Sequence, residues 1–350
     1  MHLLLLEATN RLAQLLASPK RRSRLEDALI SVIARHGGPE DARALLEELL
    51  RSPSQCAGVL PILIAHGDRD MAAALADRCV RDGRLIEDAP ADVLHALGAL
   101  GLAEATPLLF WYLRHGTYWE SMPASIGLLH LPCTEIQAEI AQEIAACEGR
   151  NIFPEFIPAL AYKTGDASWI DRLVAMGSGP TSTDCNGGLL LGIALFGETA
   201  RERFAEVLRD PHWEACGGST GSCRWAYVGT RLLGLTPQVL YADLCKRLSG
   251  PVDLLAARHQ VCLLVEMVRA WACGASTGLR WLPAAPTSAT ELLELLFAWS
   301  DPNRDDGLSG RVREALGNDA ALHMLIYGLN QELTLRMNHE IERDWALTRK

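Results

Sequence analysis

Apolar residues recur along most of this chain at the three- and four-residue spacing of amphipathic helices. Ile136, Ile140, Ile144 and Cys147 fall on one face of such a helix, because 3.6 residues complete one turn. The same spacing returns in three further stretches, at residues 169–174, 200–208 and 289–297. No stretch alternates apolar and polar residues over five or more positions, which is the pattern of a half-buried strand. The pattern predicts an all-α protein.

A unit of two helices joined by a short turn recurs from about residue 54 onward. In each unit an apolar helix ends at a turn, usually at a glycine, and a second amphipathic helix follows. The turns fall at Gly67, Gly101, Pro132, Gly165 and Gly197, so the period is 31 to 34 residues. A near-constant period of this size is typical of an α-solenoid, in which antiparallel helix pairs stack and bury their faces against neighbouring pairs.

The fifth unit resembles a HEAT-like repeat. It has the Leu-Gly ending, the Gly-acid turn, the Leu-rich second helix and the Asp-Pro step that this family commonly shows. These positions are Leu191, Gly192, Gly197, Glu198, Phe204, Val207, Leu208, Asp210, Pro211 and Trp213. The resemblance extends over residues 54–250, although Pro132 replaces a turn glycine and residues 177–180 insert a longer loop. It implies a scaffold that binds other macromolecules, and a minority of the family are enzymes.

The repeats divide the chain into three parts. Residues 1–53 are expected to form an N-terminal helical cap, and residues 54–250 the HEAT-like repeats. Residues 251–350 contain longer helices with a looser period, which predicts C-terminal repeats or a bundle that continues the stack.

The charge of the chain narrows the range of partners. It carries 43 acidic and 33 basic residues, a formal net charge of −10 at pH 7. Nucleic acid is an unexpected partner, because binding it requires neutralised phosphates. An acidic surface favours a protein partner, and in particular a basic one.

Apolar segments and cysteines predict the compartment. The longest charge-free apolar stretch, residues 185–197, is too short to span a bilayer. The N-terminus lacks the basic and long apolar regions of a signal peptide. Ten cysteines fall mostly at apolar helical positions, such as Cys79 and Cys147, which is typical of buried thiols in a reducing compartment. We expect a cytoplasmic protein without contact to a membrane. Its arginine-rich, lysine-poor composition resembles that of proteins from GC-rich bacterial genomes.

A polar, glycine-rich segment occurs twice. Residues 215–225 read ACGGSTGSCRW, residues 272–281 read ACGASTGLRW, and each copy closely follows a tryptophan. Free backbone N–H groups and the following arginine could hold a carboxylate or another anion. The alternative is capping, in which glycine ends one helix and serine or threonine begins the next. The candidate contact residues are Trp213, Gly217, Gly218, Ser219, Thr220, Arg224 and Trp225 in the first copy, and Trp271, Ser276, Thr277, Arg280 and Trp281 in the second.

Aromatic residues are densest between residues 110 and 119. A helix that buries one stripe must point some of them outward, and exposed tryptophan and tyrosine are common interface anchors. The alternative is that they pack between neighbouring repeats. Trp111, Tyr112, Tyr118 and Trp119 are therefore further candidate contact residues.

Three strings resemble catalytic or metal motifs without completing them. Residues 217–221 match G-x-S-x-G, but the preceding strand that a nucleophile elbow needs is missing. The Cys216 and Cys223 spacing does not fit a zinc knuckle. Residues 301–307 start like a calcium loop, but Asp306 and Val312 stand where glycine and glutamate are required. The sequence predicts no catalytic residue, no metal and no cofactor.

These observations favour a cytoplasmic protein-binding scaffold, in the narrower case an immunity or adaptor protein that occludes its partner. The alternative is an enzyme or small-ligand-binding protein that uses the two Gly-Ser-Thr-Gly loops as an anion site.

Overall fold

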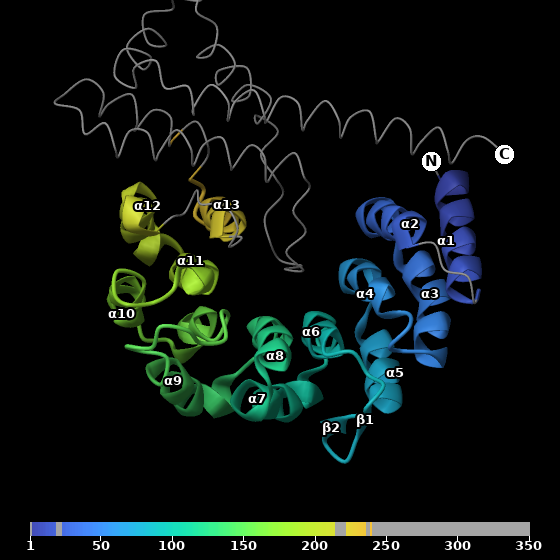
Figure 1. The fold of residues 1–350 in the computed structure, drawn as a ribbon, viewed down its shortest axis with the longest axis horizontal. Helices are drawn as coiled ribbons and strands as arrows, with labels where there is room; N and C mark the ends of the chain where they lie inside the picture. Colours follow the sequence, from blue (N-terminus) through green and yellow to red (C-terminus); the bar gives the residue numbers. More distant parts are fainter. Residues whose placement is uncertain (1, 19–22, 214–221, 236–238, 240–350) are drawn as a thin grey trace, which may run out of the picture. The chain divides into compact units, whose positions relative to one another are not determined.

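The described part of the protein is mostly helical, with almost no strand. A computed structural model describes residues 2–18, 23–213, 222–235 and 239 (Figure 1). These residues fall into two compact units, the first ending at Glu143 and the second beginning at Ile144. The predicted all-α class is confirmed for this part of the chain. The predicted C-terminal part, residues 251–350, lies outside the described residues.

In the first unit, helices pack against the next helix along the chain or against the next helix but one. Helices α1, α3 and α5 contact one another in order, and so do α2, α4, α6 and α8. The α-helices are α1 (His2–Leu16), α2 (Ser23–His36), α3 (Pro39–Arg51), α4 (Leu60–His66), α5 (Arg69–Cys79), α6 (Asp92–Ala99), α7 (Thr106–His115) and α8 (Tyr118–His130), and α9 (Gln137–Ala145) crosses the boundary. Short 3₁₀ turns precede three of them, at η1 (Ala57–Val59), η2 (Ala103–Ala105) and η3 (Thr134–Ile136).

The predicted turns lie between helices, but they turn the chain in different ways. Gly101, Gly165 and Gly197 adopt positive φ angles of 79°, 72° and 65°, a region that favours glycine because it has no Cβ. Gly67 has a φ of −73° and needs no such freedom. There Asp68 begins α5, because its side chain accepts a hydrogen bond of 3.0 Å from the backbone N–H of Met71.

Helices α6 and α8 approach until their backbones touch. A Cβ atom built on Gly98 would lie 2.2 Å from the carbonyl oxygen of Gly127, which no real Cβ contact allows. A Cβ on Gly127 would meet the side chain of Leu109 at 2.6 Å. Because Gly127 has no side chain, both α6 and the buried face of α7 can pack closely against α8 at this position.

A short β-hairpin interrupts the helices, which the sequence pattern did not predict. Strands β1 (Val80–Arg81) and β2 (Arg84–Leu85) pair antiparallel and project from the first unit (Figure 1). Asp82 and Gly83 link them with φ angles of 51° and 70°, as a type I′ turn requires. Helix α5 therefore ends at Cys79, directly before the hairpin. Two residues per strand are too few to show alternation.

The second unit surrounds one apolar helix. Every residue of α11 (Asn186–Ala194) is buried, and this helix contacts η4, α10, α12 and α13 (Figure 1). A helix that is apolar on all sides belongs at the centre of a packed unit. The other elements are η4 (Pro158–Thr164), α10 (Trp169–Gly177), η5 (Thr183–Cys185), η6 (Gly197–Ala200), α12 (Arg201–Arg209), η7 (Pro211–Trp213) and α13 (Ser222–Leu232). Among the described helices, none has the length and apolar character needed to cross a membrane.

Replacing Gly98 with alanine should destabilise the first unit. The added methyl group has no room against the Gly127 backbone, so α6 and α8 must separate at a cost of about 2 kcal/mol. Urea unfolding followed by circular dichroism measures the loss. The control is Gly38→Ala, where a Cβ meets no atom within 4 Å, and we expect a loss of about 1 kcal/mol or less there. Equal losses in the two variants would contradict the backbone contact.

Five cysteines among the described residues are buried free thiols: Cys56, Cys79, Cys133, Cys147 and Cys185. Burial raises the pKa of the Cys79 and Cys185 thiols, because a low-dielectric environment disfavours the thiolate.

These two thiols should resist iodoacetamide at pH 8 in the folded protein and react in urea, as peptide mapping by mass spectrometry can show. Their raised pKa means that the folded chain keeps these protons to higher pH than the unfolded chain. The free energy of unfolding should therefore fall as the pH rises past the ordinary thiol pKa of about 8.5. The variant Cys79→Ala/Cys185→Ala should lose part of this pH dependence. Rapid labelling of both thiols in the folded protein is the contrary result.

Candidate functional site

Helix α7 presents an aromatic face between two cavities. The larger cavity, about 540 Å³, lies between α7 and residues 132–136 and is called the α7 groove here. The smaller cavity, about 380 Å³, lies between α7 and the β-hairpin side of the unit. Glu104, Pro107 and Trp111 line both cavities. Pro107 and Trp111, four residues apart, lie on one ridge of α7, and Glu104 belongs to η2 just before the helix.

The face of α7 opposite this ridge is buried. Leu109, Tyr112 and Leu113 are the buried residues of the helix, and Leu109 lies against Gly127 of α8. Tyr112, which the sequence nominated as a contact residue, is only 6% exposed. Its hydroxyl accepts a 3.0 Å hydrogen bond from the backbone N–H of Leu85, so it fastens the hairpin to α7.

Trp111 makes the second contact with the hairpin. The guanidinium of Arg84 lies 3.4 Å from the centroid of the Trp111 ring, a cation–π contact. The other side of Trp111 carries His115, whose ring centroid is 5.3 Å away. Trp111 is half-buried between these neighbours, so it forms a flat, partly solvent-exposed surface at the rim of both cavities.

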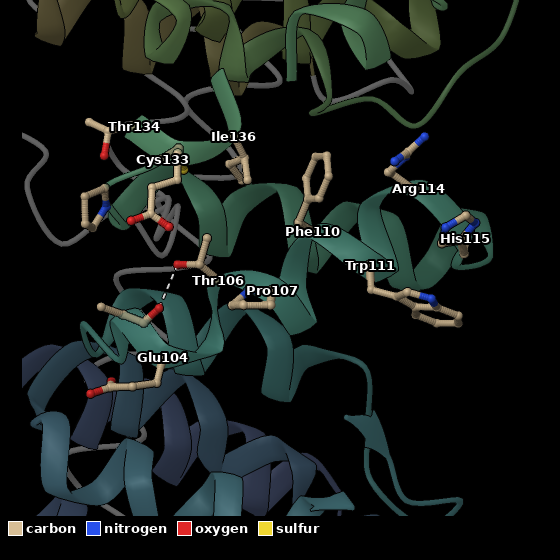
Figure 2. A pocket seen from close by; sticks show the side chains of 13 residues that line it. Glu104, Thr106, Pro107, Phe110, Trp111, Arg114, His115, Cys133, Thr134 and Ile136 are labelled. Carbon is tan, nitrogen blue, oxygen red and sulfur yellow. Dashed lines mark hydrogen bonds between the residues drawn. The ribbon is translucent and has the colours of Figure 1, made fainter. Parts of the chain in front are cut away.

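The α7 groove itself has an apolar floor with polar walls. Phe110 and Arg114 extend into it from α7, and Ile136 lines the opposite side (Figure 2). The sequence pattern placed Ile136 on a buried stripe, but this residue is only half-buried. Arg114 donates to Glu143 of α9 across the groove, with 2.8 Å between Nε and Oε1. This ion pair joins α7 to α9 at one end of the groove.

Carboxylates dominate the other end of the groove. Glu135 lines it and is exposed, and Glu139 follows four residues later on the same helical face. Glu104 pairs with Arg69. A hydrogen bond from its own backbone N–H, together with the charge of Arg69, lowers the pKa of Glu104. Glu104 therefore stays ionised at neutral pH.

The start of α8 exposes two further aromatic side chains. Trp119 is 76% exposed and Tyr118 is 36% exposed, and their rings meet edge to face with centroids 5.3 Å apart. Thr117 and Glu120 form a capping box below them, which fixes where the helix begins. Both nominated residues are therefore displayed on a rigid helix end.

The two tryptophans that flank the first glycine-rich segment are core residues of the second unit. Trp213 is 1% exposed. Its ring fills a notch at Gly177, and its carbonyl oxygen accepts a 2.7 Å hydrogen bond from Asn186 Nδ2. Trp225 is 6% exposed and packs against Phe156 with ring centroids 4.7 Å apart. These positions give both side chains a packing role.

The remaining nominated residues lie outside what the structure describes, so their contact role stays a prediction. They are Gly217, Gly218, Ser219, Thr220 and the side chain of Arg224 in the first copy, and Trp271, Ser276, Thr277, Arg280 and Trp281 in the second.

Two buried polar side chains lie at the start of α11. Glu155 is 8% exposed, and its carboxylate lies so close to Gly187 that a Cβ there would meet Oε1 at 2.1 Å. Asn186 is 1% exposed, and its Oδ1 has no hydrogen-bond partner among the residues that the structure describes. Neither residue lines the two cavities at α7. In the described ranges, no group of three or more His, Cys, Asp or Glu side chains could hold a metal ion.

Comparisons of the chain with protein-family models, with curated proteins and with solved structures find no match.

Apart from Trp111, sequence reasoning missed the residues that build the α7 groove. Phe110 and Arg114 are four residues apart, and so are Pro107 and Trp111, a spacing that places each pair on one face of α7. Because Leu109 and Tyr112 belong to the opposite face, that spacing was a usable signal. The contribution of residues 133–136 carried none, because it depends on how the next helix packs.

Replacing Tyr112 with phenylalanine should release the hairpin without unfolding the unit. The Leu85 N–H loses its partner at a cost of about 1 kcal/mol, so its amide hydrogen should exchange several-fold faster. Hydrogen exchange followed by nuclear magnetic resonance measures this. The amide of Ala96, inside α6, serves as the internal control and should exchange at its original rate. Unchanged exchange at Leu85 would show that the hydroxyl does not hold the hairpin.

Proposed function

We propose that this chain is a protein-binding scaffold, an α-solenoid of the HEAT-like kind whose partner contacts α7 and the start of α8. Two observations support a solenoid arrangement. Helices contact the next helix or the next but one along the chain, and the sequence repeats with a period of 31 to 34 residues. Within this class it acts as a cytoplasmic adaptor or immunity protein that occludes its partner, consistent with the acidic net charge of −10.

The observation that carries the proposal is the exposed aromatic surface beside the α7 groove. Trp119 is 76% exposed, and the groove of about 540 Å³ opens beside Phe110 and Trp111. Full burial of one large aromatic side chain removes about 150–250 Å² from water, about 4–6 kcal/mol at 25 cal/mol per Å². Tryptophan and tyrosine on a rigid element are therefore typical interface anchors.

Site-specific photocrosslinking in the source cells tests the proposal. A photoreactive phenylalanine analogue at position 110 or 119 should form a covalent adduct with one protein, identified by mass spectrometry. The same analogue at Ala73, an exposed position of α5, is the control and should give no such adduct.

The purified adduct partner should then bind the purified full chain. Phe110→Ala combined with Trp119→Ala should weaken this binding by up to about a thousandfold, because each aromatic anchor supplies about 2 kcal/mol and every 1.4 kcal/mol is a factor of ten. The matched control is Ile152→Ala, which truncates an apolar side chain that is 54% exposed in the second unit, and it should bind like the unaltered chain. The proposal fails if positions 110 and 119 give no protein adduct, or if the two variants and the unaltered chain bind the partner equally.

A further inference from the structure

The α7 groove carries more negative than positive charge. Glu104, Glu135, Glu139 and Glu143 supply four carboxylates along its walls and their continuation on α9, against two guanidinium groups, from Arg69 and Arg114. Two of the carboxylates, those of Glu104 and Glu143, are paired with these arginines. Glu135 and Glu139 form no ion pair with any residue that the structure describes.

The unpaired carboxylates stand one helical turn apart. Glu139 lies between Glu135 and Glu143 at four-residue intervals, so the three side chains share one face of η3 and α9. Glu143 reaches Arg114 of α7 from this face, which shows that the face is directed toward α7. Glu135 therefore presents its carboxylate at the wall of the α7 groove. Glu139 presents a second carboxylate on the adjoining face of α9, one turn beyond the groove lining.

Aromatic rings of this chain already hold guanidinium groups. Arg84 lies 3.4 Å from the ring centroid of Trp111, and Arg172 lies 3.6 Å from that of Trp169. Arg172 also donates a 2.7 Å hydrogen bond to Glu148, so one arginine contacts a ring and a carboxylate together. Phe110 in the α7 groove supplies the ring, and Glu135 on the groove wall with Glu139 on the adjoining face of α9 supplies the carboxylates. The guanidinium of Arg114 lies 5.7 Å from the centroid of the Phe110 ring.

We propose that the α7 groove binds a basic, arginine-containing segment of the partner protein. An arginine of that segment lies over Phe110, where its planar guanidinium bonds to Glu135 and Glu139. The aliphatic part of the segment covers Ile136. This inference rests on the proposed function and specifies the chemistry of the partner. The excess of carboxylates in the groove and the acidic net charge of the chain select a basic segment over an acidic one.

A peptide titration on the full chain tests the partner chemistry without the partner. The probe is a short fluorescein-labelled peptide of alternating arginine and leucine, and binding is measured by fluorescence anisotropy. It should bind, the lysine counterpart should bind several-fold more weakly, and the glutamate counterpart should not bind. Glu135→Gln combined with Glu139→Gln should weaken the arginine peptide about tenfold, because two charge-assisted hydrogen bonds are lost.

A matched variant distinguishes peptide binding in the groove from non-specific electrostatic attraction to an acidic protein. Glu47→Gln combined with Glu87→Gln removes the same charge from two exposed positions outside the groove, and it should bind within about twofold of the unaltered chain because distant surface charges are screened. Circular dichroism confirms that both double variants fold. The inference is overturned if the arginine peptide does not bind, or if the two double variants weaken it equally.

The photocrosslinked partner distinguishes this inference from the proposed function. One supporting outcome is an adduct between position 110 and an arginine-containing segment of the partner. If Glu135→Gln/Glu139→Gln also reduces the formation of this adduct, the result supports both the proposed function and the inference. An adduct at a segment without arginine, insensitive to that double variant, supports the proposed function and overturns the inference. Absence of any adduct at positions 110 and 119 overturns the proposed function, whatever the peptide titration shows.

Discussion

The close contact between Gly98 and Gly127 determines where the surface of the first unit lies. Because neither residue has a Cβ, α6 and α8 pack backbone to backbone, and Leu109 of α7 enters the space beside Gly127. Helix α7 thereby buries Leu109, Tyr112 and Leu113. Its opposite face, with Phe110 and Trp111, is left at the surface beside two cavities. The groove is thus a consequence of how tightly the two glycine-bearing helices pack.

Glycines in the second unit make room for larger or polar groups instead of another helix. Gly177 leaves a notch for the ring of Trp213, and Gly187 lies against the Glu155 carboxylate. A buried carboxylate is costly unless it is well partnered. The small residues around α11 therefore serve to fit specific side chains into a unit whose central helix is otherwise apolar.

Polar groups around α7 fix the neighbouring elements in place and determine the charge of the groove. The hairpin is held by Tyr112 and places Arg84 on the ring of Trp111. Arg114 and Glu143 link α7 to α9, so the groove has two fixed walls. Carboxylates on those walls favour a basic occupant, and the long-range field of an acidic chain would steer such a partner toward it.

The sequence by itself determined the helical class and, within the described residues, the turn positions and most of the buried stripe residues, because these depend on local spacing and on residues such as Gly101 and Gly197. Local spacing separates the two faces of the run from residue 110 to 119, but it could not decide which face is buried. Tyr112 and Trp119 are both aromatic, yet one is buried and the other is exposed. The same is true of Trp213, whose burial depends on Gly177, a residue 36 positions earlier. Only tertiary packing decided these outcomes, because exposure is set by which helices approach one another, and that is fixed by contacts between residues far apart in the chain.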